Sequence, residues 1–163
     1  MAKKTALIVG GAGYFGARLA EDLGTTHAVT ITYRSLPRAR RDWLARSGVR
    51  GVAFNSASEA DFAVAGDFDL VVNLAMPGAR EAQAAAQAAL ERGMATARAC
   101  ARLLQSGRAR RLVHFSTFHV YGGEGAPRYS ETTVAAPKHP YGHAHLAVEQ
   151  MLAPLAGALV LRP

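Results

Sequence analysis

Short apolar runs alternate with longer amphipathic stretches along this chain. Six runs have the length and residue types of buried strands: residues 5–9, 28–33, 49–54, 70–75, 111–116 and 158–161. Helical patterns occupy residues 14–23, 37–47, 80–105 and 141–155, with a weak one at 58–64. Because strands that alternate with helices pair in parallel through crossovers, the pattern predicts an α/β fold: a doubly wound parallel sheet, Rossmann-like, of about six strands with helices on both faces.

The first predicted strand runs directly into a glycine-rich turn at residues 10–16, Gly-Gly-Ala-Gly-Tyr-Phe-Gly. In a dinucleotide-binding turn Gly10 would permit the tight turn, Gly13 would let phosphates approach the backbone, and Gly16 would let the next helix pack closely on the strand. The free amides at the start of that helix would then bind the diphosphate. Such a turn can also be only a turn, but the strand before it and the amphipathic helix after it favour the dinucleotide site.

The end of the second predicted strand bears on the choice of cofactor. An NAD site usually carries an acidic residue there, which accepts hydrogen bonds from the ribose 2′-hydroxyl. The sequence at this place is Thr-Tyr-Arg-Ser, residues 32–35, with no carboxylate. Arg34 therefore favours NADP, whose 2′-phosphate pairs with a guanidinium group, and NAD is the alternative. A solvated Arg34 at a strand end is the simpler interpretation that this hypothesis competes with.

Composition limits the other classes of function. The 163 residues suit one domain spanning 1–163, and no apolar stretch is long enough to cross a membrane. The net charge of +7 comes from scattered arginines without interleaved aromatic residues, which does not indicate a nucleic-acid partner. The single Cys100 excludes a disulfide framework, and no signal peptide is visible. We expect a cytoplasmic protein with a buried Cys100 and neither a nucleic-acid nor a membrane partner.

Two later segments carry a family resemblance. Residues 116–122 read Ser-Thr-Phe-His-Val-Tyr-Gly, and residues 139–150 read His-Pro-Tyr-Gly-His-Ala-His-Leu-Ala-Val-Glu-Gln. They resemble the Ser-Ser-x-x-Val-Tyr-Gly stretch and the Pro-Tyr-Gly-x-Ser-Lys-x-x-x-Glu helix of extended short-chain dehydrogenases/reductases, the group of NAD(P)-dependent nucleotide-sugar epimerases, dehydratases and reductases. The final Leu-Arg-Pro, residues 161–163, is also similar. The resemblance implies hydride transfer between NAD(P) and a nucleotide-linked sugar.

That resemblance assigns catalytic roles to three residues. Tyr141 would act as the acid/base on a substrate oxygen, and Thr117 would hydrogen-bond the same oxygen. The family has a lysine four residues after the tyrosine, where this chain has His145, and the asparagine often found three residues before a glycine corresponds to Leu90 ahead of Gly93. A histidine is mostly neutral at physiological pH, so it supports a phenolate less well than lysine does. A catalytically weak or inactive NADP-binding module or subunit is therefore the alternative function.

Further expectations complete the sequence-based picture. We include Tyr14, Phe15, Asn55, Leu74 and Ala75 among the predicted cofactor contacts. The resemblance implies a homodimer, formed by the alanine-rich face of residues 82–101 and the tyrosine-bearing helix. It also implies a small C-terminal substrate lobe, which we expect to be absent from this chain. The spacing of His139, His143 and His145 does not indicate a metal site.

Overall fold

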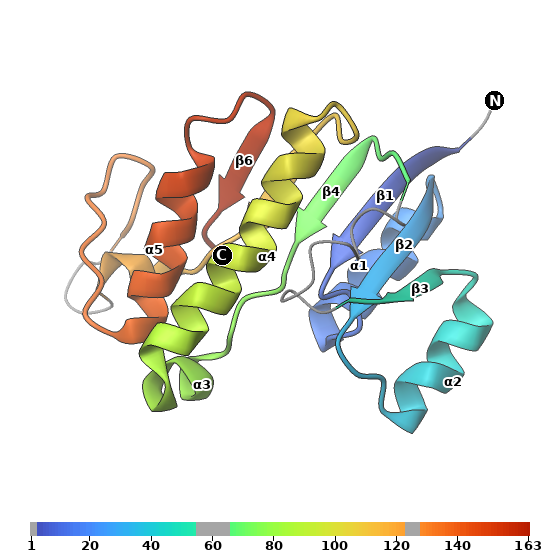
Figure 1. Ribbon diagram of the computed structural model, residues 1–163, viewed down its shortest axis with the longest axis horizontal. Coiled ribbons are helices and arrows are strands. Elements are labelled where there is room, and N and C mark those ends of the chain that lie inside the picture. The colour runs from blue at the N-terminus through green and yellow to red at the C-terminus, as the bar shows by residue number, and fades with distance from the viewer. Residues whose placement is uncertain (1–2, 55–65, 123–127) are drawn as a thin grey trace.

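The structure is a computed structural model that describes residues 3–54, 66–122 and 128–163. In this part of the chain six strands form one parallel sheet with the order β3-β2-β1-β4-β5-β6 (Figure 1). The strands are β1 (Lys4–Val9), β2 (His27–Tyr33), β3 (Arg50–Ala53), β4 (Leu70–Asn73), β5 (Leu112–Phe115) and β6 (Ala158–Leu161). The predicted doubly wound sheet is confirmed, and its strand order reverses between β1 and β4.

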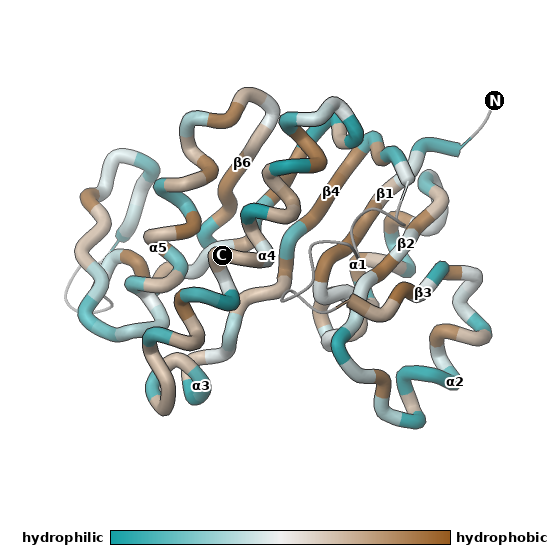
Figure 2. Tube along the Cα trace, in the orientation of Figure 1, coloured by the Kyte–Doolittle hydropathy of each residue, from teal (hydrophilic) through white to brown (hydrophobic). Residues whose placement is uncertain are grey.

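Helices cover both faces of this sheet. They are α1 (Tyr14–Gly24), α2 (Arg38–Ser47), α3 (Ala79–Ala84), α4 (Ala86–Gln105) and α5 (Pro140–Leu152), with a 3₁₀ helix η2 (Phe118–Tyr121). Successive side chains of β1 enter different cores: Ala6 and Ile8 pack with residues of α1 and α2, whereas Leu7 and Val9 pack with residues of α4 and α5. Figure 2 shows the resulting hydrophobic colour of β1 and β4, which are buried between the two helical layers.

The prediction of a single helix over residues 80–105 is wrong, because the structure has two helices there, α3 and α4. Ala85, with φ −148° and ψ 69°, leaves the helical conformation and separates α3 from α4. Alanine is the best helix former, so nothing in its intrinsic preference signals this break. The break lets α3 lie beside the start of α4 (Figure 1), where Glu81 Oε1 is 2.7 Å from Arg92 Nη1. In a continuous helix these residues would be about 16 Å apart along the axis, so tertiary packing decides the geometry.

Two element ends differ from the prediction by more than one residue. β4 stops at Asn73 rather than residue 75, because the Asn73 side-chain oxygen accepts the Ala75 N–H at 3.1 Å and turns the chain away. α5 stops at Leu152 rather than residue 155, since Pro154 has no N–H to continue the hydrogen bonds of the helix. The weak helix at 58–64 and the predicted contact Asn55 lie outside the described residues.

Candidate functional site

The glycine turn joins β1 to α1 through three close approaches. Gly10 has φ +79°, and a Cβ there would lie 3.0 Å from the Cβ of Ala75. A Cβ on Gly16 would lie 2.6 Å from the Cα of Gly11, so the close approach that this glycine permits is between the helix and the turn itself. Position 11 also requires glycine, which the motif did not predict, because a Cβ on Gly11 would lie 2.7 Å from the Ile31 side chain of β2.

Gly13 differs from these three glycines because it is open. A Cβ at Gly13 would have only the Gly10 carbonyl oxygen within 4 Å, at the ordinary distance of 3.6 Å. Gly13 is also the N-cap of α1, and as a glycine it has no side chain to cap that helix end. The first amides of a helix have no partner within the helix, and they attract an anion. The turn therefore fits a phosphate group, with room at Gly13 for its approach.

A cleft of about 430 Å³ opens over this turn, at the carboxyl ends of β1, β2 and β4. Its volume is in the range of small-ligand sites, and its place is the point where the strand order reverses. The described residues that line it are Gly10, Ala12, Gly13, Thr32, Tyr33, Arg34, Ser35, Pro37, Phe54, Leu74, Ala75, Met76, Pro77, Glu81, Arg92 and Thr96. Five of the predicted cofactor residues are among them: Gly10, Gly13, Arg34, Leu74 and Ala75.

Three other predicted cofactor residues do not line the cleft. The side chain of Tyr14 is 81% exposed, and Phe15 packs on Phe115 of β5 with ring centroids 5.2 Å apart. Gly16 is buried against Gly11. Tyr14, Phe15 and Gly16 nevertheless form the first turn of α1, whose amides face the same helix end as Gly13.

Sequence reasoning also missed cleft residues. The Thr32 hydroxyl accepts the Gly10 N–H at 3.1 Å, which fixes the turn from the neighbouring strand. Glu81 of α3 and Arg92 of α4 form an ion pair in the wall of the cleft. A threonine at the end of a strand gives no sequence signal for such a role, and the ion pair depends on the unpredicted break at Ala85.

The predicted catalytic residues lie on adjoining elements. Thr117 is buried immediately before η2, and its Oγ1 accepts the His119 N–H at 3.3 Å. The start of α5 packs directly on η2, since a Cβ on Gly142 would lie 2.6 Å from the His119 carbonyl oxygen. The neighbouring Tyr141 is half-buried, with its ring edge-on to that of His119 at 5.5 Å. The fold therefore brings the Thr117 and Tyr141 segments together at the ends of β5 and α5.

His145 lies beneath Tyr141, with ring centroids 4.6 Å apart. Its side chain is buried, and neither ring nitrogen has a hydrogen-bond partner. Burial lowers the pKa of His145 to about 4; Glu149 opposes this shift, and His119 adds to it. The imidazole is therefore neutral at pH 7 and does not supply the fixed positive charge that the family's lysine supplies.

A second buried histidine adjoins this one. His114 of β5 has its ring centroid 6.2 Å from that of His145, and burial lowers its pKa to about 4 as well. The Asn73 side-chain amide nitrogen lies 3.1 Å from His114 Nδ1, which makes Nδ1 the acceptor and leaves the proton on Nε2. That Nε2 is buried without a partner.

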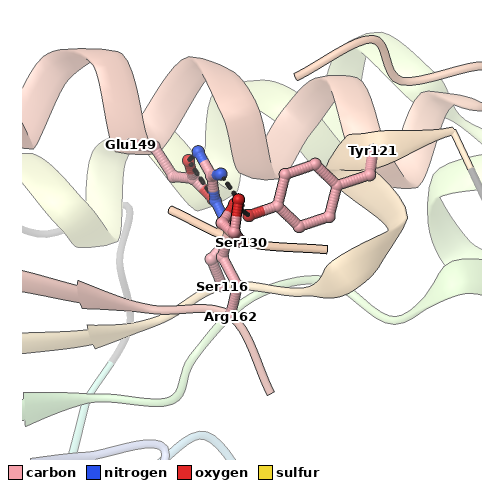
Figure 3. A network of polar contacts seen from close by, with 5 residues as sticks. All are labelled: Ser116, Tyr121, Ser130, Glu149 and Arg162. Atoms are coloured by element: carbon pink, nitrogen blue, oxygen red, sulfur yellow. Dashed lines mark hydrogen bonds and ion pairs between the residues drawn. The ribbon is translucent and has the colours of Figure 1, made fainter. Parts of the chain in front are cut away.

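The remaining motif residues build a polar network (Figure 3). Arg162, after β6, donates from Nε and Nη2 to the Glu149 carboxylate of α5 at 2.5 to 3.1 Å, and from Nη1 to the Tyr121 hydroxyl at 2.8 Å. Ser116 donates to the same carboxylate, and the Tyr121 hydroxyl donates to the Ser130 carbonyl oxygen at 3.1 Å. These residues tie β5, η2, α5 and the end of β6 together, a structural role that their spacing did not reveal.

Other candidate chemistry finds no support in the part of the chain that the structure describes. No three His, Cys, Asp or Glu residues there gather in a group that could hold a metal ion, and His143 is exposed whereas His145 is buried. Cys100 is buried as predicted, and burial raises the pKa of its thiol to about 12. Within the described ranges, every helix is too short or too polar to span a bilayer.

Comparison with known proteins agrees with this geometry. The chain belongs to the NAD dependent epimerase/dehydratase family, whose model matches residues 6–162. No curated protein matches the chain.

Many solved structures share the fold. The UDP-Glc/GlcNAc 4-epimerase from Campylobacter jejuni is 22% identical with a TM-score of 0.85, and the match covers 98% of this chain and 53% of that one. UDP-glucose-4-epimerase from Stenotrophomonas maltophila, with bound NAD and formylated UDP-arabinopyranose, is 24% identical with a TM-score of 0.84, and the match covers 98% and 52%. The Bordetella bronchiseptica enzyme WbmG, in complex with NAD and UDP, is 21% identical with a TM-score of 0.83, and the match covers 99% of this chain and 53% of that one. The chain therefore spans about half the length of these proteins.

Proposed function

We propose that this chain binds a nicotinamide dinucleotide over its glycine turn and serves hydride transfer to or from a nucleotide-linked sugar. The observation that carries the proposal is the uncapped start of α1 at Gly13, which opens into the cleft where the strand order reverses. Membership of the NAD dependent epimerase/dehydratase family supports it. The matched structures are about twice as long, so we assign to residues 1–163 the cofactor-binding domain and not the whole sugar site.

In this proposal the chain's own residues handle the proton. Tyr141 exchanges a proton between its phenol oxygen and an oxygen of the substrate, and Thr117 hydrogen-bonds the same oxygen. The dinucleotide, when bound, supplies or accepts the hydride. Gly13 and the first amides of α1 would hold its diphosphate, and Leu74 and Ala75 would line the cleft beside it.

Arg34 supports a preference for NADP over NAD. It lies exposed in the cleft at the end of β2, next to Ser35 and without a carboxylate from that strand end. Calorimetric titration should show tighter NADPH than NADH, and Arg34→Ala should remove about 1.5 to 3 kcal/mol of NADPH binding alone. Arg46→Ala, an exposed arginine near the far end of α2 and outside the cleft lining, is the matched control. Equal affinities in the unaltered chain would leave NAD, the cofactor in the family's description, as the natural one.

A second candidate function is a dinucleotide-binding module with weak or no turnover. The neutral, buried His145 favours it, because a phenolate needs a nearby positive charge. The two functions are separated by following the conversion of added UDP-sugars together with the absorbance of the bound cofactor, because an epimerase returns the hydride and leaves no net change in the cofactor. The enzyme shows turnover that Tyr141→Phe abolishes and His145→Lys raises, with the exposed His143→Lys as control. A module binds cofactor and shows no turnover in any of these variants.

We also propose a homodimer through α4 and α5, which lie side by side in the structure (Figure 1). Many small residues of α4, such as Ala89, Gly93 and Ala97, are buried against the chain's own core. A dimer would therefore use the exposed faces of these helices. Light scattering at micromolar concentration tests the proposal, and a monomeric mass contradicts it.

A further inference from the structure

The wall of the cleft that α3 and α4 form contains an ion pair. Arg92 of α4 and Glu81 of α3 both line the cleft, with Nη1 and Oε1 2.7 Å apart. Together with Arg34 they are the charged side chains among the described lining residues. A carboxylate in a cleft that fits a phosphate group would oppose ligand binding unless the cation beside it neutralised that carboxylate.

Arg92 retains donor capacity beyond this pair. Its Nε is buried and has no hydrogen-bond partner, although a guanidinium group carries five N–H donors. About a third of each side chain is exposed, 32% for Arg92 and 37% for Glu81. Partly exposed ion pairs contribute little to the stability of a fold, so a stronger anion can replace the carboxylate at little cost.

The break at Ala85 is what places Glu81 there. Without it, Glu81 would lie about 16 Å along the axis from Arg92, and the guanidinium group would have no carboxylate beside it. Gly93 holds the following turn close to the cleft wall, because a Cβ there would lie 2.9 Å from the Met76 side chain. The arrangement positions a cation in the cleft and gives it an internal counter-ion.

We propose that Arg92 binds the diphosphate of the dinucleotide and that Glu81 is the counter-ion it exchanges for that diphosphate. The inference rests on the proposed cofactor function and adds two residues to its site. A diphosphate carries two negative charges and accepts bidentate hydrogen bonds from a guanidinium group, which a single carboxylate matches less well. Since NAD and NADP share the diphosphate, Arg92 and Glu81 should affect both cofactors equally.

Calorimetric titration of NADH and NADPH into four chains tests this. Arg92→Gln should weaken both cofactors by about 10- to 100-fold. Glu81→Gln should tighten both by about two- to fivefold, because it frees the guanidinium group. Arg98→Gln removes the same charge from an exposed position of α4 outside the cleft lining, and it should leave both affinities within about twofold.

The opposite signs separate a binding role from a structural one. If Arg92→Gln and Glu81→Gln weaken binding alike, the pair only ties α3 to α4, and the inference is overturned. It is also overturned if Arg92→Gln weakens NADPH alone, which would assign Arg92 to the 2′-phosphate. Should Arg92→Gln unfold, Arg92→Lys keeps the charge without the bidentate geometry and should lose part of the affinity for both cofactors. If the unaltered chain binds neither cofactor, the proposed function itself fails, whereas normal binding with unresponsive variants refutes only the role of Arg92.

Discussion

The residues around Tyr141 give this site an unusual electrostatic character. Below the tyrosine lie two buried imidazoles, His114 and His145, which have three ring nitrogens without partners. Burial lowers the pKa of each ring to about 4, so both are neutral at pH 7. The family resemblance selected Thr117 and Tyr141 as candidate catalytic residues, but it could not predict that His145 is buried, because burial depends on the packing of α5 against β5 and η2.

These histidines predict a pH dependence of stability. The unfolded chain protonates them near pH 6.5, whereas the folded chain protonates them only near pH 4. The free energy of unfolding should therefore fall as the pH drops from about 6.5 to about 4, by up to about 3 kcal/mol for each histidine, and then level off. Urea denaturation followed by circular dichroism at several pH values measures it.

A variant isolates the contribution of His145. His145→Leu removes one buried titrating group and should reduce the change in unfolding free energy over this pH range, whatever it does to stability at pH 7. His143→Gln, on the exposed side of the same helix, should leave the pH dependence as it is. A profile unchanged by His145→Leu would show that folding does not lower the pKa of this ring.

The glycine turn predicts a contrast within one helix. Gly16→Ala places a methyl group 2.6 Å from the Gly11 backbone, so it should destabilise the fold by about 1 to 3 kcal/mol. Gly24→Ala, at the other end of α1, meets nothing within 4 Å and should be neutral or stabilise by up to about 1 kcal/mol. Thermal unfolding of the two variants gives the comparison, and equal effects would contradict the packing of α1 on the turn.

The polar network of Figure 3 predicts that loss of its central ion pair destabilises the fold, because the pair joins several elements. Glu149→Gln leaves the Arg162 guanidinium group without its carboxylate in a site where Glu149 is only 7% exposed, and it should cost about 3 kcal/mol. Glu91→Gln, on an exposed stretch of α4, is the control and should change stability by less than about 0.5 kcal/mol. Denaturant unfolding measures both, and a loss as small as the control's would show that the ion pair does not hold β5, α5 and β6 together.

At the scale of the elements, the apolar runs predicted the strands because a parallel sheet buries both faces of each strand. The separation of α3 from α4 could not be predicted in this way. Ala85 lies in an alanine-rich stretch, and its non-helical conformation comes from packing of α3 against α4 and α5. The same break brings Glu81 and Arg92 together. These two cleft residues could not be predicted from the sequence, because the break between α3 and α4 could not be predicted.

At the scale of the whole molecule, the strand order determines where a ligand can lie. The reversal between β1 and β4 leaves a cleft over the glycine turn, and both the turn and Arg34 were predictable from short motifs with known strand–turn–helix context. Thr32, Glu81 and Arg92 were not, because they reach the cleft from strands and helices whose side-chain directions depend on the complete fold.

The measurement that tests the account most directly is dinucleotide binding by the Gly13→Ala chain. A Cβ at Gly13 meets no atom closer than 3.6 Å, and alanine at a helix N-cap is less favourable than glycine by about 1 kcal/mol. Gly13→Ala should therefore still fold, with a stability loss of about 1 kcal/mol, yet bind NADH and NADPH at least about tenfold more weakly in calorimetry, because its methyl group occupies the approach of the phosphates. Unchanged affinity in Gly13→Ala, or no binding of either cofactor by the unaltered chain, would contradict the assignment of the glycine turn as the dinucleotide site.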